Sequence, residues 1–328
     1  MSSKAAGAGF GALLARTGRS TIRVESLIVL VLLIGAMAIL SPYFLSVSNF
    51  LNILLATSVI GVLAIGATYV ICSAGLDLSL GSVLGFAGVI GALAVDQLGL
   101  PWPAGLLACL VAGAFCGLIN GVLVTRARIP AFIVTLGMLG IARGAALVLT
   151  NGHPVYGLPA ELLFLGQGRP LGIPMPVLVF VGVALIAHYM LAHTTFGRYT
   201  LVIGDNEAAA RATGIRVERH RVKLDVLSGT MAGIAGLLFM ARVNAGDPTA
   251  GSTYELTAIT AAIIGGTNLF GGRGSVLGTF IGALIMGVLQ NGLNLLAVQS
   301  YYQQMAIGAV LILAVWLDRI NAQRLQQA

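Results

Sequence analysis

The sequence predicts an all-α integral membrane protein, built as a polytopic bundle of about ten transmembrane helices. Of its 328 residues, 58% are hydrophobic and only 9% are charged, whereas soluble domains carry about 25% charged residues. Runs of roughly 20 apolar residues, the length that crosses a bilayer as a helix, recur along most of the chain. The strict alternation of β-barrel strands is absent from the sequence, so a helical bundle is the expected fold class.

The ten spans follow from the apolar runs and divide the chain into three parts. A cytoplasmic N-terminal segment is expected over 1–25, a transmembrane domain over 26–317 and a cytoplasmic tail over 318–328. About 25 residues precede the first apolar run, and no small-residue cleavage site follows it promptly, so we expect the first span to be retained. The spans are expected at 26–41, 50–73, 82–98, 103–124, 130–150, 174–192, 222–241, 256–271, 275–297 and 302–317.

The distribution of Lys and Arg predicts the topology. With the N-terminus inside, fifteen of the eighteen basic residues fall on inside segments, Arg169 and Arg242 fall outside, and Arg143 falls within a span. The positive-inside rule therefore places both termini and the long loop 194–223 in the cytoplasm. Topology thus accounts for the net charge of +7, which weakens the case for a nucleic-acid partner.

That loop contains the signals of a short helix and six of the eighteen basic residues. Asp205 or Asn206 can cap the helix at its start, Glu207 and Arg211 can pair at i,i+4, and Gly214 can end it in the left-handed conformation. The local sequence fits either a docking element for a cytosolic partner or a solvated loop with one helical turn.

Two apolar segments are interrupted by polar and glycine-rich residues, at 73–82 and 265–275. The five residues GSVLG occur at 81–85 and again at 274–278. Broken segments in corresponding halves are typical of transporters built from repeats. The predicted topology runs both copies in the same direction, so an inverted repeat would require one span to move.

Two ionisable residues are predicted within or beside the spans. Asp77, in the first interrupted segment, is a candidate for a gate because a carboxylate at membrane depth is costly. Alternatively, Asp77 or Ser79 caps the helix that follows. Arg143 either faces a polar pathway or extends to the outer membrane surface.

Amide side chains form a further set of pathway candidates. Gln290 and Asn294 share one helix face at i,i+4, and Asn291 and Asn294 share one at i,i+3. Such amides can bond the hydroxyls of a polyol along a path, or they can join helices to each other. Asn120 and Asn268 are weaker candidates of the same kind.

Two outside segments could form an extracytoplasmic docking face, although both could also be ordinary connectors. The first, 151–174, begins at Asn151 and is rich in Pro and Gly. The second runs from Arg242 through Asp247 to Glu255 and has turn chemistry.

The sequence lacks the usual motifs of enzymes. Its two lysines, Lys4 and Lys223, are not in a P-loop, so the chain is not expected to hydrolyse ATP by that route. Three cysteines, Cys72, Cys109 and Cys116, lie in apolar runs without metal-ligand spacing. We therefore expect no catalytic residues, no metal and no cofactor in this chain.

Several short motifs occur together in an order that is specific. The chain resembles the membrane permeases of bacterial ABC sugar importers, in the branch that carries ribose and related monosaccharides. The resemblance covers essentially the whole chain. It rests on residues 75–82, 143–144, 150–152, 197–199, 204–211, 214–215, 248–251, 254–256, 265–267, 291–296 and 300–303.

The resemblance implies a homodimer in the bacterial inner membrane, surrounded by lipid. It also implies two copies of a separate ATP-hydrolysing subunit, which binds ATP and Mg, and a periplasmic sugar-binding protein that would meet Asn151, Arg242, Asp247 and Glu255. The loop at 204–215 would be the coupling helix that docks on the ATPase. Its expected docking residues are Gly204, Asn206, Glu207, Ala209, Ala210, Arg211, Gly214 and Ile215.

Glu207 departs from the wider importer pattern, because it lies one residue early and about 100° round the helix. The resemblance therefore does not identify the residue of the ATPase that Glu207 would contact.

The implied activity is import of a monosaccharide by alternating access. Ribose is the first expectation, followed by xylose, arabinose, galactose or an autoinducer-type furanose. A stand-alone channel or secondary carrier for a small polar solute is the alternative, and it would leave the docking helix unexplained.

Overall fold

The computed structural model describes residues 24–327, and across this range the protein is helical. Within it, the only β pairing is an isolated bridge between Val155 and Gly246. These observations confirm the predicted all-α class. The predicted N-terminal segment 1–25, apart from its last two residues, lies outside the described residues.

Thirteen α-helices and one 3₁₀ turn follow each other in the described chain. They are α2 (Val24–Leu40), α3 (Val47–Cys72), α4 (Leu80–Asp96), α5 (Trp102–Thr125), α6 (Ala131–Thr150), α7 (Ala160–Gln167), the 3₁₀ turn η2 (Pro170–Gly172), α8 (Met175–His193), α9 (Thr195–Asp205), α10 (Glu207–Ala212), α11 (Val217–Val243), α12 (Tyr254–Ile264), α13 (Val276–Leu295) and α14 (Ser300–Gln327).

Six of the described helices, α3, α5, α6, α8, α11 and α13, are long and apolar enough to cross a membrane. This confirms an integral membrane protein made of helices. Each predicted span overlaps one apolar helix, but the apolar parts of α2, α4, α12 and α14 have only 10–17 residues. The predicted count of about ten full crossings is therefore not confirmed. The predicted span 256–271 is wrong in its second half, because α12 already ends at Ile264.

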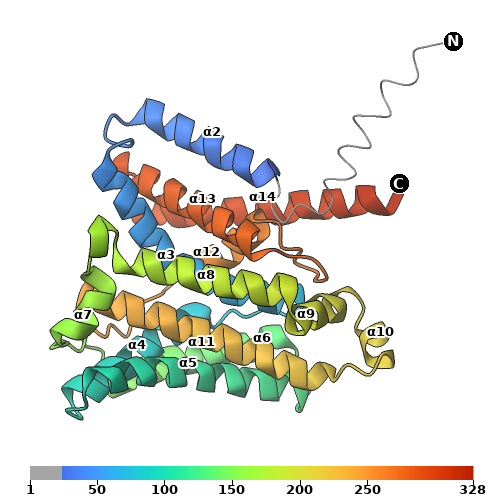
Figure 1. The fold of residues 1–328 in the computed structure, drawn as a ribbon, viewed down its shortest axis with the longest axis horizontal. Coiled ribbons are helices and arrows are strands. Elements are labelled where there is room, and N and C mark those ends of the chain that lie inside the picture. Colours follow the sequence, from blue (N-terminus) through green and yellow to red (C-terminus); the bar gives the residue numbers. More distant parts are fainter. Residues whose placement is uncertain (1–23, 328) are drawn as a thin grey trace.

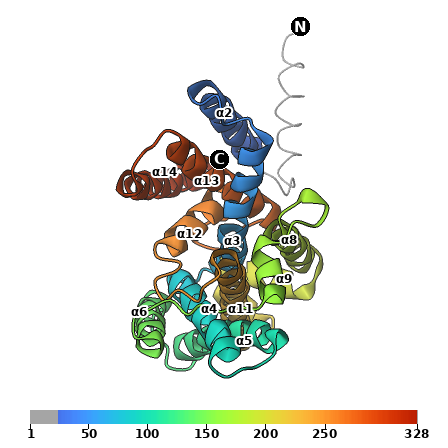
Figure 2. The ribbon, with the colours of Figure 1, turned by 90° about the vertical axis from the view of Figure 1, so that its left-hand side faces the viewer.

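The long helices lie side by side, with α9 and α10 at one end of the bundle and α7 at the other (Figure 1). Helices α3 and α11 occupy the centre when the bundle is viewed along the helices (Figure 2). Most residues in their apolar windows are buried, whereas α6 and α8 keep most of theirs at the surface. The core is therefore organised around α3 and α11.

Both central helices are followed by a non-helical segment and a shorter helix. Helix α3 leads through residues 73–79 to α4, and α11 leads through residues 244–253 to α12. Helices α3 and α11 run in opposite directions (Figure 1). Helix α3 packs on α12 and α13, and α11 packs correspondingly on α4 and α5. The two halves therefore have an inverted arrangement, as in many transporters.

This arrangement corrects the pairing of interrupted segments. The partner of the break at 73–79 is the segment 244–253, whereas 265–275 is the connection between α12 and α13. The GSVLG identity suggested the wrong partner. Its two copies lie at the starts of α4 and α13, whereas the helix that corresponds to α4 in the other half is α12. The first turns of α4 and α12 meet at Gly81, where a β-carbon would overlap the Gly251 carbonyl and the Glu255 carboxylate.

Glycines bring α5 and α11 into direct backbone contact. A β-carbon at Gly113 would overlap the carbonyl oxygen of Gly229, and one at Gly117 would overlap the carbonyl oxygen of Asp225. Close contact through small residues is a common way for helices to associate in lipid, where van der Waals packing replaces the hydrophobic effect.

Replacing Gly113 with Ala should lower the melting temperature of the protein in detergent, because α5 and α11 must separate to admit the methyl group. Overpacking of this kind costs about 1–3 kcal/mol. Gly137→Ala in α6 is the matched control, since no atom of a neighbouring residue lies within 4 Å of the place that its β-carbon would take. This control should be neutral or slightly stabilising. Trp fluorescence during heating measures both variants, and equal melting temperatures would contradict the direct contact.

Candidate functional site

The predicted polar loop contains two helices at one end of the bundle. Helix α10 begins where Asn206 Oδ1 accepts a hydrogen bond from the Ala209 amide at 2.9 Å. Its last residue is Ala212, and Gly214, two residues later, has a φ of 84°, the left-handed conformation expected after the helix. Of the two predicted caps, Asn206 is therefore the one used. Helix α9 is not predicted by the sequence reading, although Thr194 caps it by accepting a hydrogen bond from the Gly197 amide.

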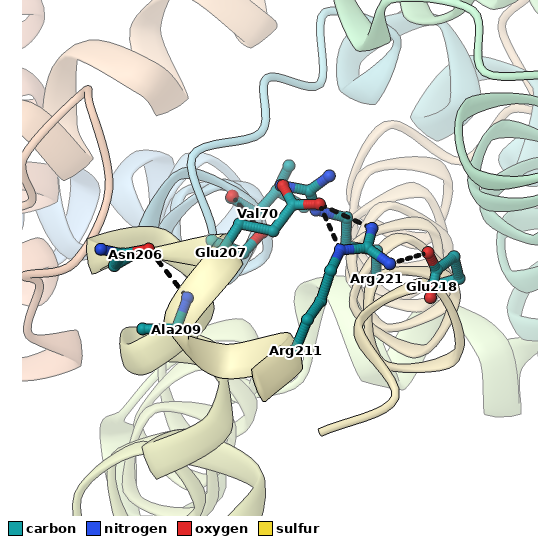
Figure 3. Close-up of polar contacts among 8 residues, drawn as sticks. Val70, Asn206, Glu207, Ala209, Arg211, Glu218 and Arg221 are labelled. Carbon is teal, nitrogen blue, oxygen red and sulfur yellow. Dashed lines mark hydrogen bonds and ion pairs between the residues drawn. The ribbon is translucent and has the colours of Figure 1, made fainter. Parts of the chain in front are cut away.

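Glu207 is held by two arginines of its own chain (Figure 3). Its Oε1 lies 2.7 Å from Arg211 Nη2, and its Oε2 lies 2.7 Å from Arg221 Nη2 in α11. Arg211 also pairs with Glu218. The predicted i,i+4 pair is present, and the pair with Arg221, which we call the strut, links α10 to α11.

The arginines also determine the protonation of Glu207. The hydrogen bond from Arg211 lowers the pKa of Glu207 below its ordinary value of 4.5, and the charge of Arg221 acts in the same direction. Since the pKa is lowered on folding, the ion pairs stabilise the structure above pH 4.5 and are lost as the pH falls through the lowered pKa.

The predicted docking residues divide into an inner and an outer set. Ala210 is buried in a small apolar cluster with Ile203 and Val217, and Ile215 packs against it. These contacts hold α10 on the bundle. The outer set is exposed and consists of Asn206, Ala209, Arg211 and Gly214.

Gly204 is placed between two other parts of the chain. A β-carbon there would overlap the carbonyl of Cys72, at the end of α3, and would meet the amide of Gly272. That amide itself donates to the Cys72 carbonyl at 3.0 Å. The corner between α9 and α10 is therefore packed directly against the start of the break at 73–79 and against the segment 265–275.

Asp77 is the centre of a buried polar cluster between α4, α5 and α11. Its Oδ1 accepts hydrogen bonds from the Ser79 amide at 2.9 Å and the Ser79 hydroxyl at 2.6 Å. Its Oδ2 accepts a hydrogen bond from the Ser228 hydroxyl at 2.8 Å. Asn120 donates to the Ser79 hydroxyl at 3.1 Å. The structure thus brings three predicted pathway residues together and adds Ser228, which sequence reading missed.

Neither Asp77 nor Ser79 is a conventional side-chain cap of α4. Ser79 occupies the N-cap position without a side-chain capping bond. Asp77 instead fixes the turn before α4, because it bonds the Ser79 amide two residues on.

Asp225 is a second buried carboxylate that sequence reading missed. It lies within the predicted span 222–241, one helical turn before Ser228, and only 9% of it is exposed. An acidic residue inside an apolar span was the available signal. It lines a cavity of about 500 Å³, which is also lined by the four residues of the ion-pair network, Glu207, Arg211, Glu218 and Arg221.

Arg143 reaches from α6 to another part of the chain. Its guanidinium donates to the carbonyl oxygen of Pro248, in the segment before α12. The negative charges of Glu255 and Asp247 attract this guanidinium group. Gly85 in α4 leaves room for it, since a β-carbon there would lie 3.1 Å from Arg143 Nη1. One predicted pathway residue and two predicted docking residues therefore form a single group.

The other outer candidates lie at helix ends. Asn151 follows α6 in the left-handed conformation and is exposed. Arg242 is half-buried in the last turn of α11, and its carbonyl oxygen accepts a hydrogen bond from Gln167 at 3.2 Å.

Of the remaining amides, Asn291 and Asn294 fit the helix-joining alternative. Asn291 and Asn49 exchange hydrogen bonds at 2.8 and 3.0 Å and so join α13 to α3. Asn294 accepts a hydrogen bond from Gln303 at 2.8 Å. Asn268 accepts one from the Phe270 amide within its own turn. Gln290 is half-buried on α13. These residues do not join the Asp77 cluster.

The structure has six helices that are long and apolar enough to cross a membrane, two broken segments in inverted order and a capped helix at one end of the bundle. This arrangement fits a multi-pass membrane transport protein. The chain belongs to the family described as the permease component of the branched-chain amino acid transport system, whose model matches residues 49–315. Members of this class are non-catalytic subunits, in agreement with the expectation that the chain is not an enzyme.

Characterised relatives are similar over nearly the whole chain. The ribose import permease protein RbsC of Escherichia coli is 46% identical over 300 residues, which cover 90% of this chain and 92% of the relative. RbsC of Haemophilus influenzae is 43% identical, covering 92% and 94%. The D-allose transport system permease protein AlsC of E. coli is 37% identical, covering 89% and 90%. No solved structure matches the chain.

Replacing Glu207 with Gln should loosen α10, because the side chain keeps its length but loses both ion pairs. Hydrogen exchange of the amides at 207–212, followed by mass spectrometry at pH 7, should accelerate about two- to fivefold, as expected for exposed ion pairs. Glu218→Gln is the matched control and should have a smaller effect, since Glu218 pairs with Arg211 alone among the described residues. Equal exchange in both variants would argue against the strut.

Proposed function

We propose that this chain is the transmembrane permease subunit of an ATP-driven importer that moves a monosaccharide, ribose first, into the cytoplasm. The relatives named for ribose import are 46% and 43% identical, and the relatives named for D-allose and xylose transport are 37% and 34% identical. This ranking supports ribose ahead of the other sugars.

The observation that carries the proposal is helix α10. A six-residue helix that is capped at both ends and anchored by Ala210 leaves an exposed surface available for a partner. We propose that this surface seats in a cleft of a separate ATP-hydrolysing subunit, which holds ATP and Mg, and that two such subunits serve a homodimer of this chain. In this proposal both termini and α10 face the cytoplasm of a bacterium, as the positive-inside rule predicts.

We propose ten crossings in the assembled protein. Helices α4 and α12 are short because the non-helical segments 73–79 and 244–253 complete their paths through the bundle. Such backbone is tolerated at membrane depth where protein groups bond it, as Asp77 does for the first break. Helix α14 continues through most of the proposed cytoplasmic tail, to Gln327.

In the proposed transport cycle, closure of the ATPases moves α10, and the strut carries this movement to α11. From α11 it reaches the first break, because Ser228 bonds Asp77. Helix α11 also packs on α4 and α5, so its displacement changes the position of both. The bundle then opens alternately to the two sides of the membrane.

At the opposite end we propose a docking face for a periplasmic sugar-binding protein, formed around Asn151, Arg242, Asp247 and Glu255. Arg143 connects this face to the broken helices, because it bonds the Pro248 carbonyl beside α4 and α12. Affinity for sugar would come from the binding protein, so the path itself needs few strong polar groups.

A stand-alone channel or secondary carrier is the competing function, and co-purification separates the two. Tagged chain from its native host should retain a P-loop ATPase in detergent. Gly214→Pro should lose that ATPase, because proline cannot adopt the φ of 84° found there and has no amide to donate to the Arg211 carbonyl. A chain that purifies alone and moves solute in liposomes without ATP would refute the importer.

Charge reversal tests the strut within the assembled importer. Glu207→Lys should lower ATP-driven ribose uptake in proteoliposomes about tenfold, within the range of typical coupling free energies of about 1–3 kcal/mol. Arg221→Glu alone should do the same, because two carboxylates would then face each other. The double variant Glu207→Lys with Arg221→Glu should recover part of the uptake, since the pair between 207 and 221 is restored with its charges exchanged while the pair with Arg211 stays lost. No recovery, with the ATPase still bound, would show that Glu207 acts on the ATPase and not through α11.

A further inference from the structure

The cavity of about 500 Å³ lies between the end of α3, the turn that joins α5 to α6, helix α10 and the first turns of α11. The ion-pair residues on its wall are partly exposed, from 27% for Arg221 to 48% for Arg211 and Glu218. Asp225, on the same wall, is only 9% exposed. The cavity thus extends from the ion-pair network at the surface toward a buried carboxylate inside the bundle.

Asp225 is unusual because its carboxylate has no hydrogen bond to any described residue. Arg221, one turn earlier in α11, attracts it, and Asp77 repels it. The carboxylate lies over α5, where a β-carbon at Gly121 would be 3.2 Å from Asp225 Oδ2. A buried carboxylate without donors is costly, so a group that supplies donors from the cavity would be stabilised there.

The neighbouring polar groups cannot supply those donors. Both oxygens of Asp77 already accept hydrogen bonds from Ser79 and Ser228. Two hydroxyl groups line the cavity itself, from Ser73 and Thr125, and both already donate to backbone carbonyl oxygens, those of Val70 and Gly121. They therefore supply no donor to Asp225 either.

The charges around the cavity indicate the kind of ligand. Three carboxylates line it, from Glu207, Glu218 and Asp225. Three guanidinium groups balance them, from Arg128, Arg211 and Arg221. No cluster of three or more His, Cys, Asp or Glu suited to a metal occurs in the described chain. A neutral molecule with several donors and acceptors matches this surface better than a cation does.

We propose that this cavity is a binding site for a polyol, with Asp225 accepting hydrogen bonds from two neighbouring hydroxyl groups. The volume is within the range of about 300–1,000 Å³ that is usual for small-molecule sites. The inference rests on the proposed function, in which the polyol is the transported monosaccharide near its release to the cytoplasm. It places a sugar contact inside a single chain, and the strut stands beside the opening through which the sugar leaves.

Protection of an introduced cysteine tests the site without requiring ATP. Ala131 lines the cavity and becomes reactive as Ala131→Cys, whereas the native Cys72, Cys109 and Cys116 are buried. A small membrane-impermeant maleimide is applied to inside-out vesicles that contain the full chain. Ribose should slow the labelling, and Asp225→Asn should weaken the protection about tenfold, which is about 1.4 kcal/mol.

Three controls separate binding at the site from other effects. Thr213→Cys, which lines a different pocket, should be labelled at the same rate with and without ribose. Betaine at equal osmolarity has no hydroxyl donors and should not protect Ala131→Cys. Asp205→Asn removes a carboxylate outside the cavity and should leave the protection unchanged.

The proposal falls if ribose does not protect Ala131→Cys, if betaine protects it equally, or if Asp225→Asn protects as well as the native residue. If Asp225→Asn changes the labelling rate even without sugar, the protection of Ala131→Cys relative to Thr213→Cys decides whether ribose binds in the cavity. ATP-driven ribose uptake by the native complex, measured in parallel, tests the importer separately. Uptake without protection would remove the site and leave the importer standing.

Discussion

The structure depends on how the backbone amides and carbonyls of a non-helical segment find hydrogen-bond partners inside a membrane protein. Lipid offers no hydrogen-bond partners, so any segment that leaves the helical conformation must find them within the protein. Asp77 meets this need at the first break, since it bonds the Ser79 amide before α4 and the Ser228 hydroxyl in α11. One carboxylate therefore both fixes the start of a helix and ties it to the centre of the bundle.

Helix α11 contacts α10, the Asp77 cluster and α5. Its first turns hold Glu207 through Arg221, its middle holds Asp77 through Ser228, and its glycine-rich face lies against α5. Helix α11 is a single helix of 27 residues. In the proposed cycle, a displacement at α10 would therefore reach the buried polar cluster without a separate pathway of side chains.

The sequence predicted what depends on nearby residues and missed what depends on packing. Asn206, Glu207 and Gly214 act within one short helix, so its cap, ion pair and end could be predicted. The break at 244–253 could not, because its residues resemble an ordinary turn and only their place beside α4 shows its equivalence to 73–79. Asp225 was hidden because a long apolar run outweighs one acidic residue in a count of hydrophobicity.

The strength of the strut limits what it can do. An ion pair between residues 27% and 36% exposed contributes about 0–1 kcal/mol. Moving a two-state equilibrium from 1:99 to 99:1 requires about 5.5 kcal/mol. The strut therefore cannot hold the bundle in one conformation or drive it to another. It can only direct a movement whose free energy comes from elsewhere, which in the proposed importer is a partner that hydrolyses ATP.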